Sequence, residues 1–221
     1  MRGGSFGILL LVIGVLSMVW LLSDLHGRLD FIDLQRFLFS QPKDDVLILL
    51  GDICLYDENK EDNGKFTEML LSSQKQILIV DGNHENFDYL NSLPEEDWNG
   101  GKVHRLADNV LHLQRGYVYN IFGWTCFVFG GTAAMATDAQ LQNAYENLKL
   151  QEHRVDFILT HDYYKRMPQD RKNLFEELLG FIDEKVFFQR WYCGHHHRNQ
   201  KLDDKHTIVY DRLVPLFVGE P

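Results

Sequence analysis

The sequence predicts an α/β fold in which sheets are layered against helices. Strand-like apolar runs alternate along the chain with stretches whose apolar residues recur at helical spacing. Such alternation favours mixed layers over separate blocks of helices and strands. Short polar motifs come directly after several of the apolar runs, as is typical of loops that carry a site at the carboxyl ends of strands. With 221 residues, of which 45% are apolar, the chain is long enough to bury a large core in a single domain.

Three apolar runs in the first part of the chain predict strands, at residues 19–22, 46–50 and 77–80. The run 46–50 contains no polar residue, which is expected of a strand covered on both faces. Apolar residues at helical spacing predict helices at residues 29–39 and 66–71, after the first and second of these strands.

The second part of the chain begins with shorter runs between residues 102 and 129, separated by turn-forming pairs. This texture predicts antiparallel strands joined by hairpins. Alternation then returns, with helices predicted at residues 139–150 and 174–182. The remaining strands are predicted at residues 155–159 and 186–192, with one or two more within residues 208–218.

Five short motifs follow predicted strands. They are Asp24-Leu25-His26, Gly51-Asp52, Gly82-Asn83-His84-Glu85, Thr160-His161 and Gly194-His195-His196-His197. Each motif alone has an ordinary explanation, because Gly-Asp and Gly-Asn pairs are common in turns and a single histidine is often a hydrogen-bonded core residue. The five together, in this order, are hard to obtain by chance. Their imidazole and carboxylate groups favour Mn, Fe, Co, Ni or Zn over Mg or Ca.

The whole set of motifs resembles the calcineurin-like metallophosphoesterase superfamily. The stretches Asp81-Gly82-Asn83-His84-Glu85-Asn86-Phe87 and Trp98-Asn99-Gly100-Gly101-Lys102-Val103-His104 are also similar to a branch of small, single-domain bacterial members, over about residues 18–214. The resemblance implies a four-layer α/β sandwich, in which two sheets pack together between outer helices. We therefore expect one metallophosphoesterase domain at residues 18–221, preceded by a hydrophobic N-terminal extension at residues 1–17.

By this resemblance, two divalent transition ions would bind, with Mn as the expected metal and Fe, Zn, Co or Ni as alternatives. The first ion would be held by Asp24, His26, Asp52 and His197. The second ion would be held by Asp52, Asn83, His161 and His195. Asp52 would therefore bridge the two ions. Such a pair lowers the pKa of a shared water, so that a hydroxide can attack phosphorus near neutral pH.

The resemblance also implies a general acid. His84 would protonate the leaving alkoxide, with Glu85 or another carboxylate to orient its ring. In an extended segment, His195 and His197 would project alike and His196 would point away, so His196 is expected to be a pocket wall or a substrate contact. The expected activity is hydrolysis of a phosphomonoester or a phosphodiester.

The expected partner is a small phosphorylated substrate. A formal net charge of -10 and the absence of long Lys/Arg runs argue against nonspecific nucleic-acid binding. Protein Ser/Thr phosphatases follow their Gly-Asp with an Asp-Arg-Gly arginine that grips phosphate, but Gly51-Asp52 is followed by Ile53-Cys54-Leu55-Tyr56-Asp57. A phosphoprotein substrate is therefore disfavoured, and Arg28 or Arg198 is left as a phosphate contact. The alternative function is a non-catalytic interaction scaffold, although no ligand position is lost.

The expected location is cytoplasmic. Cys54, Cys126 and Cys193 lack a C-x-x-C spacing, which predicts reduced, mostly buried thiols. The alternative is a membrane-associated protein, anchored by the apolar residues 6–17. Twelve helical residues span only about 18 Å, less than the roughly 30 Å of a hydrocarbon core. We therefore expect residues 1–17 to be a dispensable extension, and membrane contact only if they are an anchor.

Overall fold

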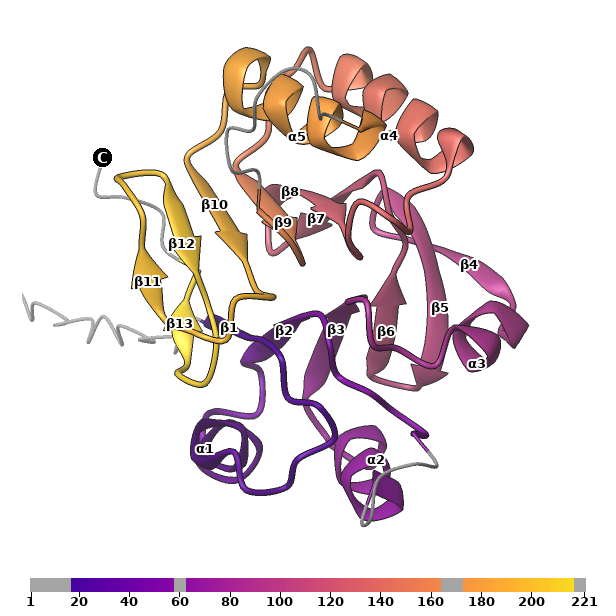
Figure 1. Cartoon of the computed structure of the whole chain (residues 1–221). Coiled ribbons are helices and arrows are strands. Elements are labelled where there is room, and N and C mark those ends of the chain that lie inside the picture. The colour runs from indigo at the N-terminus through magenta and orange to yellow at the C-terminus, as the bar shows by residue number, and fades with distance from the viewer. Residues whose placement is uncertain (1–16, 58–62, 164–172, 217–221) are drawn as a thin grey trace, which may run out of the picture.

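The computed structural model describes residues 17–57, 63–163 and 173–216. In this part of the chain two sheets pack face to face, with helices on the outer face of each (Figure 1). The first sheet contains, in spatial order, β13 (Val214–Pro215), β1 (Val19–Leu22), β2 (Val46–Leu50), β3 (Gln76–Val80), β6 (Val110–Leu113), β5 (Gly101–Ala107) and β4 (Glu95–Trp98). The second contains β11 (Gln200–Lys201), β12 (His206–Ile208), β10 (Arg190–Cys193), β9 (Phe157–Thr160), β8 (Trp124–Phe129) and β7 (Tyr117–Ile121).

The helices form the two outer layers. Below the first sheet lie α1 (Ile32–Ser40) and α2 (Asn63–Leu71), and above the second lie α4 (Asp138–Leu150) and α5 (Leu174–Lys185) (Figure 1). A short helix, α3 (Phe87–Ser92), lies beside the edge of the first sheet near β4 and β5 (Figure 1). The predicted four-layer α/β sandwich is confirmed.

Alternation of side chains along β2 explains why its sequence is entirely apolar. Ile48 and Leu50 belong to the core between the two sheets, together with Leu159 of β9. Leu47 and Leu49 belong instead to the core between the first sheet and α1 and α2. Because both faces of the strand are covered, no position of β2 is left for a polar residue.

The predicted hairpins between residues 102 and 129 are present. β5 pairs antiparallel with β6, and β7 pairs antiparallel with β8. In addition, β6 pairs in parallel with β3 and β8 pairs in parallel with β9, so the two hairpins extend different sheets. The two-sheet division therefore begins in the chain between Leu113 and Tyr117.

Among the described elements, α3, β4 and β11 were not predicted, and β12 shares only Ile208 with the strands predicted within residues 208–218. β4 has the sequence Glu-Glu-Asp-Trp and is an edge strand whose partner in the sheet is β5. Its acidic residues carry no strand signal, and tertiary pairing decides its conformation. The strand predicted from residue 186 begins only at Arg190, because Val186 is the C-cap of α5.

The three cysteines are buried, as predicted, and none of them forms a disulfide. Among the helices of the described residues, none is long and apolar enough to cross a membrane. Residues 1–16 of the predicted extension lie outside the described part, so the anchor and the dispensable extension both stay predictions.

Candidate metal centre

The polar motifs meet where parallel strands of both sheets end. β1, β2 and β3 run parallel to one another, and so do β9 and β10. Four of the motifs lie in the loops after β1, β2, β3 and β10, and the fifth, Thr160-His161, begins with the last residue of β9. Because the carboxyl ends of parallel strands share an edge, loops distant in sequence deliver their side chains to one place.

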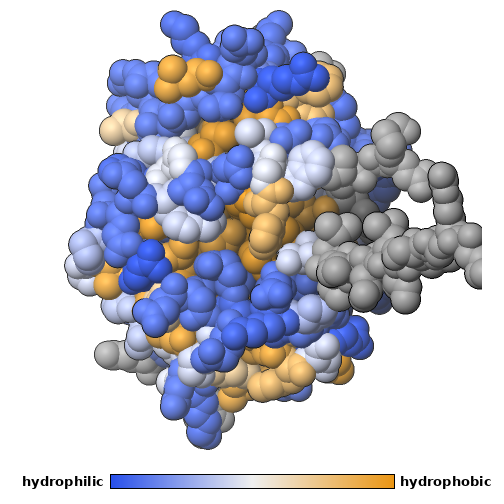
Figure 2. Space-filling view, turned by 180° about the vertical axis from the view of Figure 1, so that it is seen from behind, coloured by the Kyte–Doolittle hydropathy of each residue, from blue (hydrophilic) through white to orange (hydrophobic). Residues whose placement is uncertain are grey.

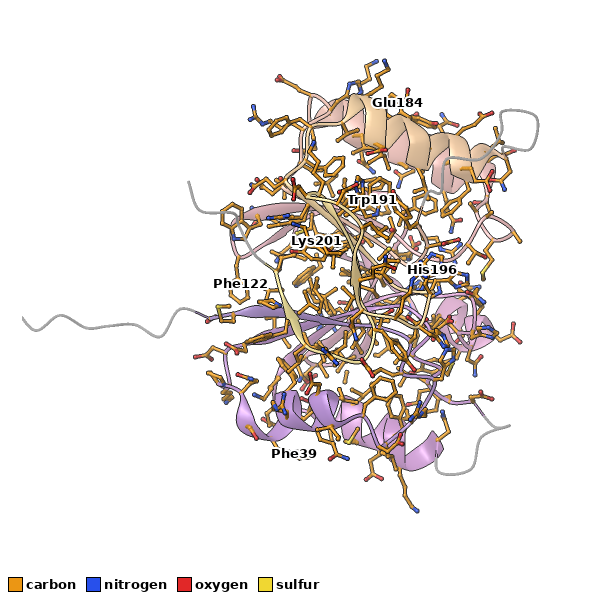
Figure 3. All side chains as sticks on the ribbon, turned by 60° about the vertical axis from the view of Figure 1, so that its left-hand side comes forward. Phe39, Phe122, Glu184, Trp191, His196 and Lys201 are labelled. Atoms are coloured by element: carbon orange, nitrogen blue, oxygen red, sulfur yellow. The ribbon has the colours of Figure 1, made fainter. Side chains whose placement is uncertain are left out.

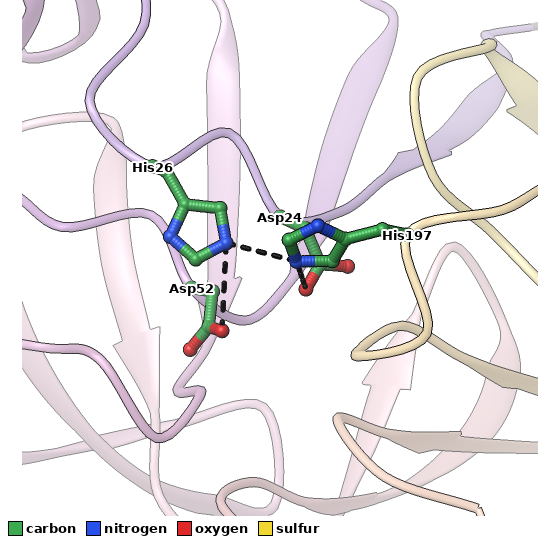
Figure 4. A group of neighbouring side chains, drawn as sticks. All are labelled: Asp24, His26, Asp52 and His197. Carbon is green, nitrogen blue, oxygen red and sulfur yellow. Dashed lines mark hydrogen bonds and ion pairs between the residues drawn. The ribbon is translucent and has the colours of Figure 1, made fainter.

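One group of side chains consists of Asp24, His26, Asp52 and His197 (Figure 4). The His26 Nε2 atom lies 3.0 Å from His197 Nε2 and 3.7 Å from Asp52 Oδ2. The His197 Nε2 atom lies 3.3 Å from Asp24 Oδ1. One donor atom from each residue falls within 4.8 Å of the others, which is the spacing of ligands around one cation.

A second group consists of Asp52, His161 and His195, again with one donor atom of each within 4.8 Å of the others. The Oδ1 atom of Asn83 lies 3.1 Å from His161 Nε2, so the amide joins this group. Asp52 belongs to both groups, which is the position of a bridging carboxylate. The structure thus brings all seven predicted ligand residues together.

Several contacts fit a cation at these groups. The Oδ1 atom of Asp24 is buried and has no hydrogen-bond partner, although burial of such an atom is costly unless something compensates for it. The other carboxylate oxygen of Asp24 accepts the N–H of His195 at 3.0 Å, which links the two groups. His161 Nδ1 lies 2.8 Å from the Leu50 carbonyl oxygen, which can only accept, so Nδ1 carries the proton. When the ring is neutral, the lone pair of Nε2 therefore faces the site.

Electrostatics couple Asp52 and His161. Burial acts to raise the pKa of Asp52, but the hydrogen bond and charge of His161 and the N–H of His84 hold it well below its usual range. Burial likewise acts to lower the pKa of His161, but Asp52 outweighs it and raises that pKa to about 9. The pair therefore favours a positive charge at the position of His161 Nε2, where a metal ion can replace the proton.

The backbone at the ligands is unusual. Five of the ligand residues have a left-handed φ between 48° and 65°: Asp24, His26, Asp52, His195 and His197. Such angles are uncommon for residues other than glycine and cluster at functional sites. They also correct the expectation of an extended His195-His196-His197 segment. His195 and His197 point to adjacent groups because a tight turn separates them.

His196 belongs to neither ligand group. Its Nε2 atom lies 3.6 Å from Asp162 Oδ1, and its side chain is partly exposed. Figure 3 shows His196 at one side of the molecule and Phe122, in the β7–β8 turn, at the opposite side.

A cavity of about 610 Å³ lies near Phe122, lined also by Trp98 and Ile121. In Figure 2, which views the molecule from behind, hydrophobic residues form a band between two polar layers. This cavity is remote from the ligand groups.

His84 lies at the rim of the first group. Its backbone N–H donates to Asp52 Oδ1 at 2.8 Å, and its exposed ring lies with its centroid 5.6 Å from that of His26. Glu85 does not orient this ring. Its carboxylate accepts the N–H groups of Ile53, Cys54 and Gly82 at 2.8 to 3.1 Å, and so ties the loop after β2 to the loop after β3.

A buried ion pair supports the Asn83-His84 loop and was not predicted from the sequence. Arg115 Nε donates to Asp81 Oδ2 at 2.8 Å, and Arg115 Nη1 donates to the Met135 carbonyl oxygen at 3.0 Å. Gly131 N–H donates to the Asp81 carbonyl oxygen at 2.8 Å. The Gly130-Gly131 pair was the available signal, because a Cβ on Gly130 would collide with Asp81 and one on Gly131 with Arg115.

The chain belongs to the calcineurin-like phosphoesterase family, which residues 17–215 match. Among solved structures, the chain is similar to a protein of unknown function from Aquifex aeolicus, with 13% identity over 90% of this chain and 95% of that chain and a TM-score of 0.49. It is also similar to a phosphopantetheinyl hydrolase from Mycobacterium tuberculosis, with 15% identity over 93% and 97% of the two chains and a TM-score of 0.45. No curated protein shows significant sequence similarity to the chain.

Proposed function

We propose that this protein hydrolyses a phosphomonoester or a phosphodiester of a small molecule, using two divalent transition ions. The observation that carries the proposal is a pair of ligand groups that share Asp52, in a member of a phosphoesterase family. Imidazole nitrogens mixed with carboxylate oxygens support Mn, Fe, Zn, Co or Ni, of which we expect Mn.

Each part of the site has a separate task. When bound, the ions supply a nucleophile at neutral pH and offset the negative charge of the phosphoryl oxygens. Asp52 would be the ligand common to both ions, and the Leu50 carbonyl oxygen fixes the ring of His161. An imidazole N–H of His84 protonates the leaving oxygen, since the exposed ring borders the first ligand group.

Metal analysis and hydrolysis of two test esters check the proposal. We expect about two transition ions per chain, and activity on 4-nitrophenyl phosphate or bis(4-nitrophenyl) phosphate. A chelator should abolish the activity and added Mn should restore it. Protein without bound metal, together with hydrolysis that a chelator does not affect, contradicts the proposal.

A further inference from the structure

Tyr210 lies against the first ligand group. Its ring stacks on the ring of His197, with the centroids 5.2 Å apart and the planes only 5° from parallel. The ring of Phe31 contacts the same tyrosine edge-on, at 5.9 Å and 90°. Contacts of both kinds are favourable for aromatic rings, so the orientation of Tyr210 is fixed from two directions.

The backbone of Tyr210 is held as well. Its carbonyl oxygen accepts the N–H of Ser23 at 3.1 Å, and Ser23 directly precedes Asp24. Its own N–H donates to Asn199 Oδ1 at 2.9 Å, two residues beyond His197. Tyr210 therefore joins the segment that carries Asp24, after β1, to the segment that carries His197, after β10.

His197 needs such support more than His161 of the other group does. Half of its side chain is exposed (50%), and it lies in a loop with a φ of 48°. His161, by contrast, is fully buried and hydrogen-bonded to the Leu50 carbonyl oxygen. Core packing thus fixes the orientation of His161, whereas stacking on the Tyr210 ring supports the orientation of His197.

We propose that Tyr210 is a positioning residue that orients His197 and thereby keeps the ligands of the first metal site, which come from the two sheets, close together. The inference rests on the proposed metal-dependent function. Without the tyrosine ring, His197 can rotate away from Asp24 and His26, so the first ion binds more weakly. The second ion keeps its ligands. Loss of a residue that orients a metal ligand typically lowers metal affinity by about 10- to 100-fold.

The test compares Tyr210→Leu with Tyr210→Phe, which keeps the stacking ring. Tyr145→Leu is the control, because Tyr145 is also a partly exposed tyrosine in contact with an aromatic ring, but it lies on α4 in an outer layer. Mn²⁺ affinity is measured by calorimetry, and paramagnetic resonance distinguishes a coupled pair of ions from a single ion. We expect Tyr210→Leu to bind one ion about 10- to 100-fold more weakly and to lose the coupled signal. The other two variants should match the wild type.

Folding is monitored by circular dichroism. If Tyr210→Leu does not fold, Asn199→Ala serves instead, since it removes the side chain that accepts the Tyr210 N–H, together with its hydrogen bond to Asp211. That variant should weaken the same single ion. If the folded variant binds two ions with wild-type affinity, the inference is wrong. It is also wrong if the affinity for both ions falls equally. Neither result contradicts the proposed function. A wild-type protein without transition ions overturns the proposed function and the inference together.

Discussion

Asp52 is the residue on which both ligand groups depend. Its Oδ1 atom accepts the N–H groups of Asn83 and His84, each at 2.8 Å, and lies 3.5 Å from His161 Nε2. Its Oδ2 atom faces His26. The two backbone donors fix the orientation of the carboxylate, so that one oxygen is directed to each group. A neutral amide at this position keeps the shape but lacks the charge.

Asp52→Asn and His84→Ala should therefore have different effects. Asp52→Asn is expected to lose both ions and activity together. His84→Ala should keep its metal and slow turnover by about 10²- to 10⁴-fold for an ester with a poor leaving group, because a general acid is absent. A good leaving group should be affected less. Metal content and turnover are measured for both, and equal metal loss in the two variants contradicts the role of His84.

Asp81 should make stability depend on pH in the acid range. Burial acts to raise its pKa, but the charge of Arg115 and the contact with His112 lower it from 3.8 to about 2. A carboxylate whose pKa is lower in the folded state stabilises the protein above its unfolded pKa. That contribution, about 2 kcal/mol, is lost as the pH falls from about 4 to about 2.

The pH dependence of urea unfolding tests this contribution. Asp81→Asn should be less stable at neutral pH, because Arg115 loses its buried partner. Between pH 4 and 2 its free energy of unfolding should fall by about 2 kcal/mol less than that of the wild type. Asp108→Asn, in the exposed β5–β6 turn, controls for the loss of one charge. Parallel curves for the wild type and Asp81→Asn would show that the ion pair contributes nothing in this range.

At the scale of the elements, the buried strands were predictable, whereas the short strands β4 and β11 were not and the loops were only partly so. The run at residues 46–50 is fully apolar because both faces of the strand are covered, and its first and last residues are those of β2. The candidate ligand residues were predictable because carboxylate and imidazole side chains are groups that bind metal ions. Their conformation was not, since Asp and His adopt a left-handed φ more often than most residues but still rarely, so the residue types of Asp52 and His195 alone do not predict it.

Tertiary contacts explain what the sequence did not predict. Asn86 caps α3 by accepting the N–H of Tyr89 at 3.0 Å, but six residues are too few to show helical periodicity. Glu85 follows His84, which suggests an orienting role, yet its oxygens are taken by backbone donors from two loops. Only the three-dimensional arrangement shows which neighbour in sequence is a neighbour in space.

Gly130 should be sensitive to a single added methyl group. It follows β8, and a Cβ there would press on the Asp81 carboxylate and carbonyl oxygen, both of which are held by hydrogen bonds. Gly130→Ala is expected to lower the free energy of unfolding by about 1–3 kcal/mol, the usual cost of overpacking. Gly64→Ala is the matched control. Among the described residues, no atom lies within 4 Å of its added Cβ, and alanine favours the helix α2.

Urea unfolding of the metal-free proteins makes the comparison. Gly64→Ala should be as stable as the wild type or slightly more stable, because Gly64 is the second residue of α2 and alanine favours a helix more than glycine does. Equal stability of Gly130→Ala and the wild type would show that the Asp81 region adjusts to the methyl group.

At the scale of the whole molecule, the candidate site exists only when the two sheets are packed together. Asp24, His26 and Asp52 come from the first sheet, whereas His161 and His197 come from the second. The core between the sheets therefore sets the ligand distances, and bound ions would in turn hold the sheets together. The sequence predicted the ligands and the layers, but the contacts between them, such as Tyr210 on His197, appear only in the assembled sandwich.

The amino terminus sets a last whole-molecule prediction, because Met18, the second described residue, is already hydrogen-bonded to the fold. Its N–H donates to Asp45 Oδ1 at 2.9 Å, and its carbonyl oxygen accepts the N–H of Val46 at 2.9 Å. Trp20 Nε1 donates to the other oxygen of Asp45 at 2.9 Å. β1 must stay in the sheet to deliver Asp24 and cannot also be part of a membrane helix. A chain that begins at Met18 should therefore fold, bind metal and hydrolyse the test ester as well as the full chain. Its circular dichroism, metal content and turnover are compared with those of the full chain, and loss of folding in the shortened protein would show that residues 1–17 belong to the domain.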